Sequence, residues 1–158
     1  MSSISRNNTR NYGGISKLMY CIAPQSFLDP ASPATTHIRS FSLSQAEIDE
    51  SFFDLAFMHR TANHDHNGSE SVNGVAITHD IEATFHRNNA DIRAQIALTN
   101  FKKCILIYKD NNGEWYILWG LTQLDQYHTG KEPKDLNSYT ISWRGSTTFR
   151  AIPLVITA

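Results

Sequence analysis

The sequence predicts a mainly β fold: a β-sandwich or partly closed barrel of about six to eight strands, with one packed α-helix. Three observations favour this class. Val75–Phe85 alternates strictly between two faces, which predicts one long half-buried strand. Two apolar segments, Cys104–Lys109 and Glu114–Leu121, flank the turn sequence D-N-N-G and predict a β-hairpin. Tyr139–Trp143 alternates in the same way as the long strand.

The N-terminal part predicts an arm, a strand and a loop in succession. Residues 1–14 are polar and predict an extended arm, so the single domain covers residues 15–158. Ile15–Ile22 is apolar on both faces, which is typical of a buried strand. Pro24–Thr36 contains three prolines and predicts a loop. His37–Leu43 then alternates and predicts a strand with one apolar face.

A short helix is expected after Ser44. The sequence from Ser44 to Glu47 has the capping-box pattern, in which a hydroxyl and a carboxylate each accept a free backbone N–H. Ile48, Phe52 and Leu55 follow at helical spacing. Phe52–Met58 fits strand alternation equally well, so its type stays open.

The second half continues with a helix, a loop and a last strand. The predicted packed helix covers about residues 90–102, with Ile92, Ile96, Leu98 and Phe101 facing inward. Gln123–Asn137 is polar and predicts a loop, and Gly145–Thr147 predicts a turn. Thr148–Thr157 predicts a final strand, in which Pro153 indicates an edge or bulge position.

Composition excludes several function classes. The chain has 158 residues and a formal net charge of -1. It therefore lacks the strong positive charge of proteins that bind mainly to nucleic-acid phosphates. Its apolar runs are too short to span a bilayer, and its N-terminus has no apolar core. We therefore expect a soluble domain without a signal peptide and without a membrane partner. Cys21 and Cys104 lie in apolar stretches and are expected to be free and buried.

Histidines are the only enriched reactive residues. His59–Gly74 is polar and predicts a mobile loop with turns at Asn67-Gly68 and Asn73-Gly74. In it, His64 and His66 flank Asp65, a pattern able to ligate zinc. A mobile loop does not supply the supporting contacts that metal ligands need, so we expect no metal and no cofactor. His79 falls on the apolar face of the long strand and is expected to be a core histidine bonded to a backbone carbonyl, with a pocket base as the alternative.

No catalytic centre is predicted. The sequence contains neither a nucleophile elbow nor a phosphate-binding loop. Trp115, Tyr116 and Trp119 could form a sugar- or base-stacking platform. Trp115 and Trp119 share a strand face, however, and the core interpretation of that face is favoured. We therefore expect a protein that is not an enzyme.

The segment from Ala90 to the C-terminus carries a recurring pattern of turn, glycine and aromatic residues. A predicted helix is followed by a turn, a strand that ends in glycine, a loop and an outer strand. The residues that make up the pattern are Asp110, Asn112, Gly113, Trp115 or Tyr116, Gly120, Gly130, Asp135, Asn137, Tyr139 and Gly145. In this pattern the last part of the chain resembles small tail- and connector-associated virion proteins of Bacteroidetes phages and prophages, including the crAss-like group.

The resemblance implies a tail-tube-like β-sandwich that assembles into rings. We expect a structural subunit of a phage tail tube or head-tail connector, located in the virion after assembly in the host cytoplasm. Its partners would be copies of itself, neighbouring tail, portal or connector proteins, and genomic DNA passing through the lumen without sequence-specific binding. The residues expected at interfaces are Arg6, Arg10, Tyr12, Phe27, His64, His66, Tyr127 and His128.

Two other classes remain as alternatives. The first is a ligand- or carbohydrate-binding β-sandwich module that uses Trp115, Trp119 or Trp143. The second is a metal-dependent enzyme built on His59, His64 and His66.

Overall fold

The computed structural model describes residues 13–22, 40–58, 60–72, 74–86, 94, 97, 99–128, 138–147 and 150–158. These residues form nine strands and one short helix. In chain order the elements are β1 (Ile15–Ile22), β2 (Phe41–Ser44), α1 (Gln45–Ser51), β3 (Phe53–Asp54), β4 (Asn63–Ser71), β5 (Gly74–His86), β6 (Lys103–Asp110), β7 (Trp115–His128), β8 (Ser138–Thr147) and β9 (Ile152–Thr157).

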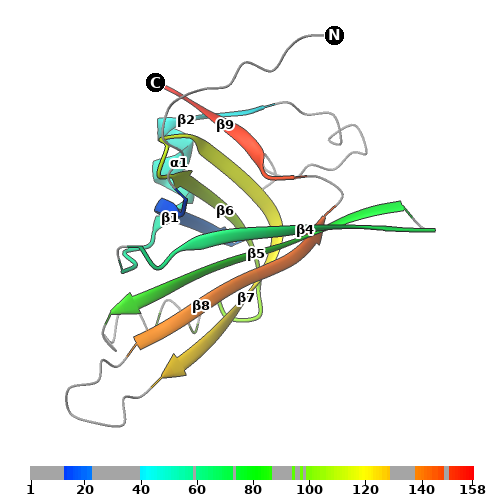
Figure 1. Cartoon of the computed structure of the whole chain (residues 1–158). Helices are drawn as coiled ribbons and strands as arrows, with labels where there is room; N and C mark the ends of the chain where they lie inside the picture. Colours follow the sequence, from blue (N-terminus) through cyan, green and yellow to red (C-terminus); the bar gives the residue numbers. More distant parts are fainter. Residues whose placement is uncertain are drawn as a thin grey trace.

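The strands join in one curved, open sheet, which confirms the predicted mainly β class (Figure 1). Its main path runs β3-β1-β6-β7-β8-β5-β4, and every pair along it is antiparallel. β9 branches off this path by pairing with β7, and it pairs in parallel with β2.

The branch arises because β7 changes neighbours along its length. Its first part pairs with β9 at Tyr116 and Ile117, and from Thr122 onward it pairs with β8. A register shift against β6 separates these two parts. Gly120 lies in this shift with φ +71, a left-handed conformation that glycine adopts without steric cost. The bulge therefore bends β7 and opens a fork between β8 and β9.

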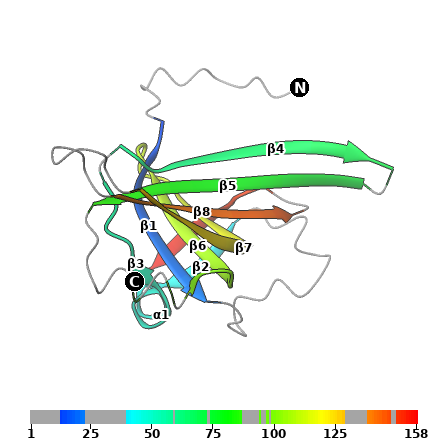
Figure 2. The same cartoon turned by 90° about the horizontal axis from the view of Figure 1, so that it is seen from below.

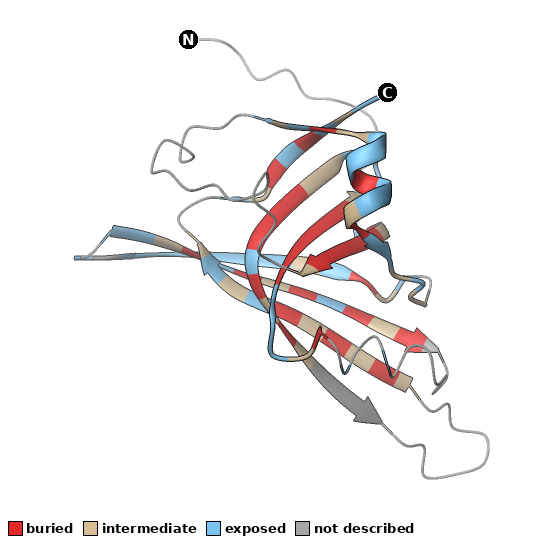
Figure 3. Cartoon of the chain, turned by 180° about the vertical axis from the view of Figure 1, so that it is seen from behind, coloured by how far each residue is buried: buried red, intermediate tan, exposed pale blue. Residues whose placement is uncertain are grey.

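Buried residues follow one another along the central strands (Figure 3). They form two apolar clusters, one on each face of the sheet. The concave face gathers residues from β1, β5, β6, β7 and β8, with Trp143 fully buried among them. On the other face, α1, β2 and β9 cover β1, β6 and β7. β1 from Leu18 to Cys21 and β6 from Cys104 to Tyr108 are thus buried on both sides. For β1 this agrees with the prediction from the apolar residues on both faces of Ile15–Ile22.

Two other strand predictions are confirmed. β5 contains the alternating segment, and Ile77, His79, Ile81, Ala83 and Phe85 are all buried. The D-N-N-G turn joins β6 to β7, and the Asp110 carboxylate accepts the backbone N–H groups of Asn112 and Glu114, each at 2.9 Å. The turn signal depends on residues that are close in sequence, and hydrogen bonds between those residues stabilise the turn.

Helix α1 begins at the predicted capping box. The Ser44 hydroxyl accepts the backbone N–H of Glu47, whose carboxylate accepts the backbone N–H of Ser44 at 2.8 Å. The helix ends at Phe52, where the backbone becomes extended, so Leu55 lies beyond it. The segment Phe52–Met58, for which the sequence allowed either a helix or a strand, contains the two-residue strand β3 and no further strand.

We expect Ser44→Ala to lower the free energy of unfolding by about 1 kcal/mol. Alanine cannot accept the backbone N–H of Glu47, so this donor loses its partner in the cap. Chemical denaturation of this variant and of Ser42→Ala measures the effect. Ser42 is an exposed serine on β2, so its replacement is expected to change stability little. Equal losses in the two variants would contradict the capping role.

The prediction of a loop over His59–Gly74 was wrong. Nine residues of this segment form β4, which pairs with β5 from Asn63↔Glu82 to Ser71↔Gly74. Asn67-Gly68 is therefore part of a strand, and the register of the hairpin continues to the pair Ser71↔Gly74. β4 has no apolar alternation because most of its side chains are exposed, and its pairing with β5 sets its conformation.

The β4–β5 hairpin extends beyond the rest of the sheet as a two-stranded arm (Figure 2). Among the described residues, β8 pairs with β5 as far as Ile77, and Gly74–Ala76 pair with β4 alone. The outer edge of β4 pairs with no strand in the described part of the chain. At the tip, Val72 and Val75 are exposed.

Two predictions in the second half are also corrected. β7 continues to His128, so the first residues of the expected loop Gln123–Asn137 form a strand against β8. Gly145–Thr147 belongs to β8 and is not a turn. A Cβ on Gly145 would lie 2.8 Å from the carbonyl oxygen of Gly120, so the glycine permits close approach of two strands.

Other predictions fall partly or wholly outside the described residues. Ala94, Ala97 and Thr99 are helical, but most of the predicted helix 90–102 is not described. Phe101 was expected to face inward and is instead 74% exposed. The arm before Gly13 and the loop Pro24–Thr36 are not described, nor is the start of His37–Leu43, whose end forms β2. Pro153 lies in the short pairing of β9 with β7, just before β9 pairs with β2.

Candidate functional site

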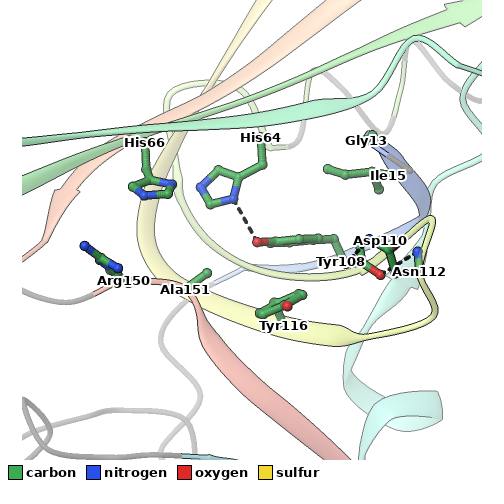
Figure 4. Close-up of a pocket in the computed structure, with 11 residues that line it drawn as sticks. Gly13, Ile15, His64, His66, Tyr108, Asp110, Asn112, Tyr116, Arg150 and Ala151 are labelled. Carbon is green, nitrogen blue, oxygen red and sulfur yellow. Dashed lines mark hydrogen bonds between the residues drawn. The ribbon is translucent and has the colours of Figure 1, made fainter. Parts of the chain in front are cut away.

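A polar cavity of about 520 Å³ opens near the fork between β8 and β9 (Figure 4). Its walls come from the start of β1, from β4, from the β6–β7 hairpin and from the residues before β9. Figure 4 shows His64 between His66 and Tyr108, with Tyr116 stacked on Tyr108 at a ring separation of 5.2 Å. Arg150 adds a cationic side chain on the side of His66.

The histidines form the chemical centre of this region. His64 and His66 are two residues apart on β4 and project from the same face. His79 on β5 is the direct cross-strand partner of His66. The ring centroids are 5.3 Å apart for His64 and His79, 5.8 Å for His64 and His66, and 6.4 Å for His66 and His79.

A chain of hydrogen bonds passes through two of these histidines. His64 Nδ1 lies 2.8 Å from Tyr108 Oη, and His64 Nε2 lies 3.1 Å from His79 Nδ1. His79 Nε2 lies 2.9 Å from Thr147 Oγ1. His79 is thus a buried histidine, as expected, but its hydrogen bonds include two to side chains. The four groups connect β6, β4, β5 and β8 through their side chains.

Burial is the main influence on the ionisation of His64. Burial first, and then charge repulsion from His79 and His66, lowers the pKa of His64 to about 4. The pKa of Tyr108 is raised, first by burial and then by Tyr116 and Asp110. His64 and Tyr108 are therefore both neutral at pH 7 and act as hydrogen-bonding groups.

The structure places only some of the predicted site residues. His64 and His66 lie at the cavity, on a strand and not on a loop. Tyr127 and His128 belong to β7, but their side chains are not described. The remaining predicted interface residues and His59 lie outside the described residues: Arg6, Arg10, Tyr12 and Phe27.

The core interpretation, which was favoured over a stacking platform, is confirmed for Trp119, and Trp143 is buried as well. Trp143 is fully buried in the concave core, and Trp119 is buried on the opposite face. Trp115 and Trp119 share a face, as their spacing predicted, and Trp115 is partly buried against the second core. The aromatic rings at the cavity are Tyr116, which the platform alternative included, and Tyr108, which sequence reasoning missed. Tyr108 lies on the predicted hairpin, but nothing in that pattern indicates a cavity beside it.

The comparisons with known proteins give no assignment. No protein-family model matches the sequence, and neither a curated protein nor a solved structure is significantly similar to it. Among the described residues, no helix is long and apolar enough to cross a membrane.

Both cysteines are free and buried, as predicted. Burial first, and then the nearby Cys21, raises the pKa of the Cys104 thiol to about 11, against a smaller lowering by Lys102. The thiol is thus held neutral at pH 7, which does not favour a role as a nucleophile.

The raised pKa of Cys104 predicts a loss of stability in alkali. The folded state binds the thiol proton more tightly than the unfolded state, whose thiol ionises near pH 9. This contribution is complete below pH 9 and disappears as the pH rises to about 11. We expect the urea midpoint to fall over this interval, and to fall less in Cys104→Ala. Identical pH profiles for the two proteins would contradict the assignment.

Proposed function

We propose that this chain is a structural subunit of a bacteriophage virion, a tail-tube or head-tail connector protein that forms a homo-oligomeric ring around the DNA channel. The observation that supports this most directly is the β4–β5 arm. It extends beyond the domain, and its outer strand edge has no partner among the described strands, which is a geometry suited to contacts between subunits.

The edge of β4 has few of the features that protect an edge strand from pairing with another chain. Exposed edge strands are normally short, or are protected by charged side chains, above all lysine, by proline or by a bulge. The charged side chains of β4 are Asp65 and Glu70. β4 is nine residues long, contains neither proline nor lysine, and pairs with β5 in continuous register. A strand of a neighbouring copy can therefore extend the sheet by adding main-chain hydrogen bonds.

The tip of the arm adds an apolar contact. Val72 is fully exposed and Val75 is 54% exposed, on an arm whose other side chains beyond His66 are mostly polar. An apolar tip on a projecting hairpin gains free energy when it inserts into a neighbouring subunit. Head-to-tail contacts of this kind generate a ring when the rotation between copies closes.

The charge of the chain suits passage of DNA. The arm carries Asp65 and Glu70 and no lysine or arginine between Asn63 and Val75. With a net charge of -1 for the whole chain, a ring of such subunits would not hold the phosphates tightly. DNA would then move through the lumen without sequence-specific contacts.

A ligand-binding module is the second candidate, and the cavity near the fork is the observation that favours it. Tyr116 and Tyr108 supply stacked rings, and His66 and Arg150 supply polar groups at the opening. The binding surface would thus lie at these tyrosines and not at the predicted tryptophans. Glycan titration followed by tyrosine fluorescence tests it, and a Tyr116→Ala variant should lose the response.

Light scattering of the purified chain tests the leading proposal. A ring subunit is expected to give a native mass that is a fixed multiple, greater than two, of 17.9 kDa. A dimer would indicate that two arms pair symmetrically, which closes the assembly without forming a ring. That result would contradict the proposed function.

A further inference from the structure

His64, His66 and His79 have the arrangement of a three-histidine metal site. Two are separated by one residue on β4, and the third lies opposite on β5 (Figure 4 shows the first two at the cavity). Three imidazoles bound to one tetrahedral zinc ion have ring centroids about 5 Å apart, since each metal–nitrogen bond is about 2.0–2.1 Å long. The observed separations of 5.3, 5.8 and 6.4 Å come close to this value.

Two of the histidines already face each other at a suitable distance. His64 Nε2 and His79 Nδ1 are 3.1 Å apart. Two nitrogens on the same tetrahedral ion are roughly 3.3 Å apart. A metal ion could therefore replace the hydrogen bond between them after a shift of a few tenths of an ångström.

The outer nitrogens of this pair have the partners that metal-bound histidines require. His64 Nδ1 lies 2.8 Å from Tyr108 Oη, and His79 Nε2 lies 2.9 Å from Thr147 Oγ1. Such contacts fix the ring orientation and the tautomer of a ligating histidine. In the metal-free chain one of the two facing nitrogens carries the proton. On binding, that histidine moves its proton to its outer nitrogen, so no net proton is released.

His66 completes the set after a change of side-chain rotamer. In the described part of the chain, no three His, Cys, Asp or Glu side chains are placed to hold a metal ion as they stand. His66 is exposed and borders the cavity, so its ring can turn toward the facing pair about its own side-chain torsions. The loop that argued against a metal site in the sequence is in fact a paired strand, which holds His64 and His66 in fixed register with β5.

We propose that His64, His66 and His79 bind one divalent transition-metal ion, with the fourth position open to the cavity. Neutral imidazole suits zinc, nickel and copper(II), and zinc is the natural probe. This site goes beyond the proposed structural role and does not depend on it, because the ligands all belong to one hairpin of one chain.

Calorimetric titration of chelator-treated protein with zinc chloride tests the proposal. We expect saturation at one ion per chain, and a cobalt(II) complex with the intense visible bands of tetrahedral coordination. Tyr108→Phe removes a supporting contact and should weaken zinc binding about 10–100-fold. His66→Ala should weaken it at least as much, and because His66 is exposed this variant is expected to fold.

His128→Ala is the matched control, since His128 pairs with Ser138 at the end of β8 remote from the cluster. It should bind zinc as the unmodified chain does. Circular dichroism without zinc verifies that each variant is folded. The proposal would be overturned by a titration that does not saturate at one equivalent, or by unchanged zinc affinity in both His66→Ala and Tyr108→Phe.

Discussion

Trp143→Ala is expected to lower the free energy of unfolding by about 3–5 kcal/mol, because it leaves a large cavity in the concave core. Trp143 is fully buried and packs where β5, β7 and β8 meet. Its indole N–H also donates to Gln123 Oε1 at 3.3 Å, inside the same core. The measurement is urea denaturation followed by far-ultraviolet circular dichroism.

Two variants separate packing from the hydrogen bond. Trp143→Phe keeps much of the volume and loses the N–H, so a smaller loss of about 1–3 kcal/mol is expected. Trp115→Ala removes a partly exposed tryptophan and should cost less than Trp143→Ala. If Trp143→Ala were as stable as the unmodified chain, Trp143 would not be a core residue, and the tryptophan-based binding surface would return as an interpretation.

Lysines on β4 are expected to weaken assembly at least tenfold while leaving the fold intact. Asn67 and Ser69 are exposed on β4, so Asn67→Lys with Ser69→Lys changes no buried contact. Lysines on an edge strand oppose pairing with another chain, since pairing would bring their charges against the neighbour. We expect the association constant to fall at least tenfold, which corresponds to about 1.4 kcal/mol. Sedimentation velocity measures the shift toward monomer.

A control with the same added charge identifies the edge as the cause. Ala46 on α1 and Thr78 on β5 are exposed, and neither lies on the outer edge of β4. Ala46→Lys with Thr78→Lys should therefore assemble like the unmodified chain. Equal loss of assembly in both double variants would assign the effect to net charge and would remove the β4 edge from the interface.

Local patterns in the sequence predicted much of the fold. The period of two in β5, the D-N-N-G hairpin and the Ser44 capping box all depend on residues close in sequence, and all three are confirmed. β4 was missed because its polar sequence has no apolar face, and only pairing with β5 makes it a strand. Gly145 was misassigned because its role depends on contact with Gly120, which is remote in sequence.

The candidate site was harder to predict than the fold. His64 and His66 were recognised as a pair of possible metal ligands, but their segment was predicted to be a mobile loop, which would not hold the two side chains in fixed positions. The groups that complete the cluster are Tyr108, His79 and Thr147, on three other strands. Nothing in the spacing of these residues along the chain indicates that the curved sheet brings them together. Sheet register, which requires knowledge of the whole topology, determines the site.

The most direct test of the central claim is electron microscopy of the purified chain in negative stain. If the β4–β5 arms link copies head to tail, the images will contain closed rings with a central channel, or tubes of stacked rings. Particles the size of a single domain at concentrations of several hundred micromolar would contradict a ring-forming virion subunit.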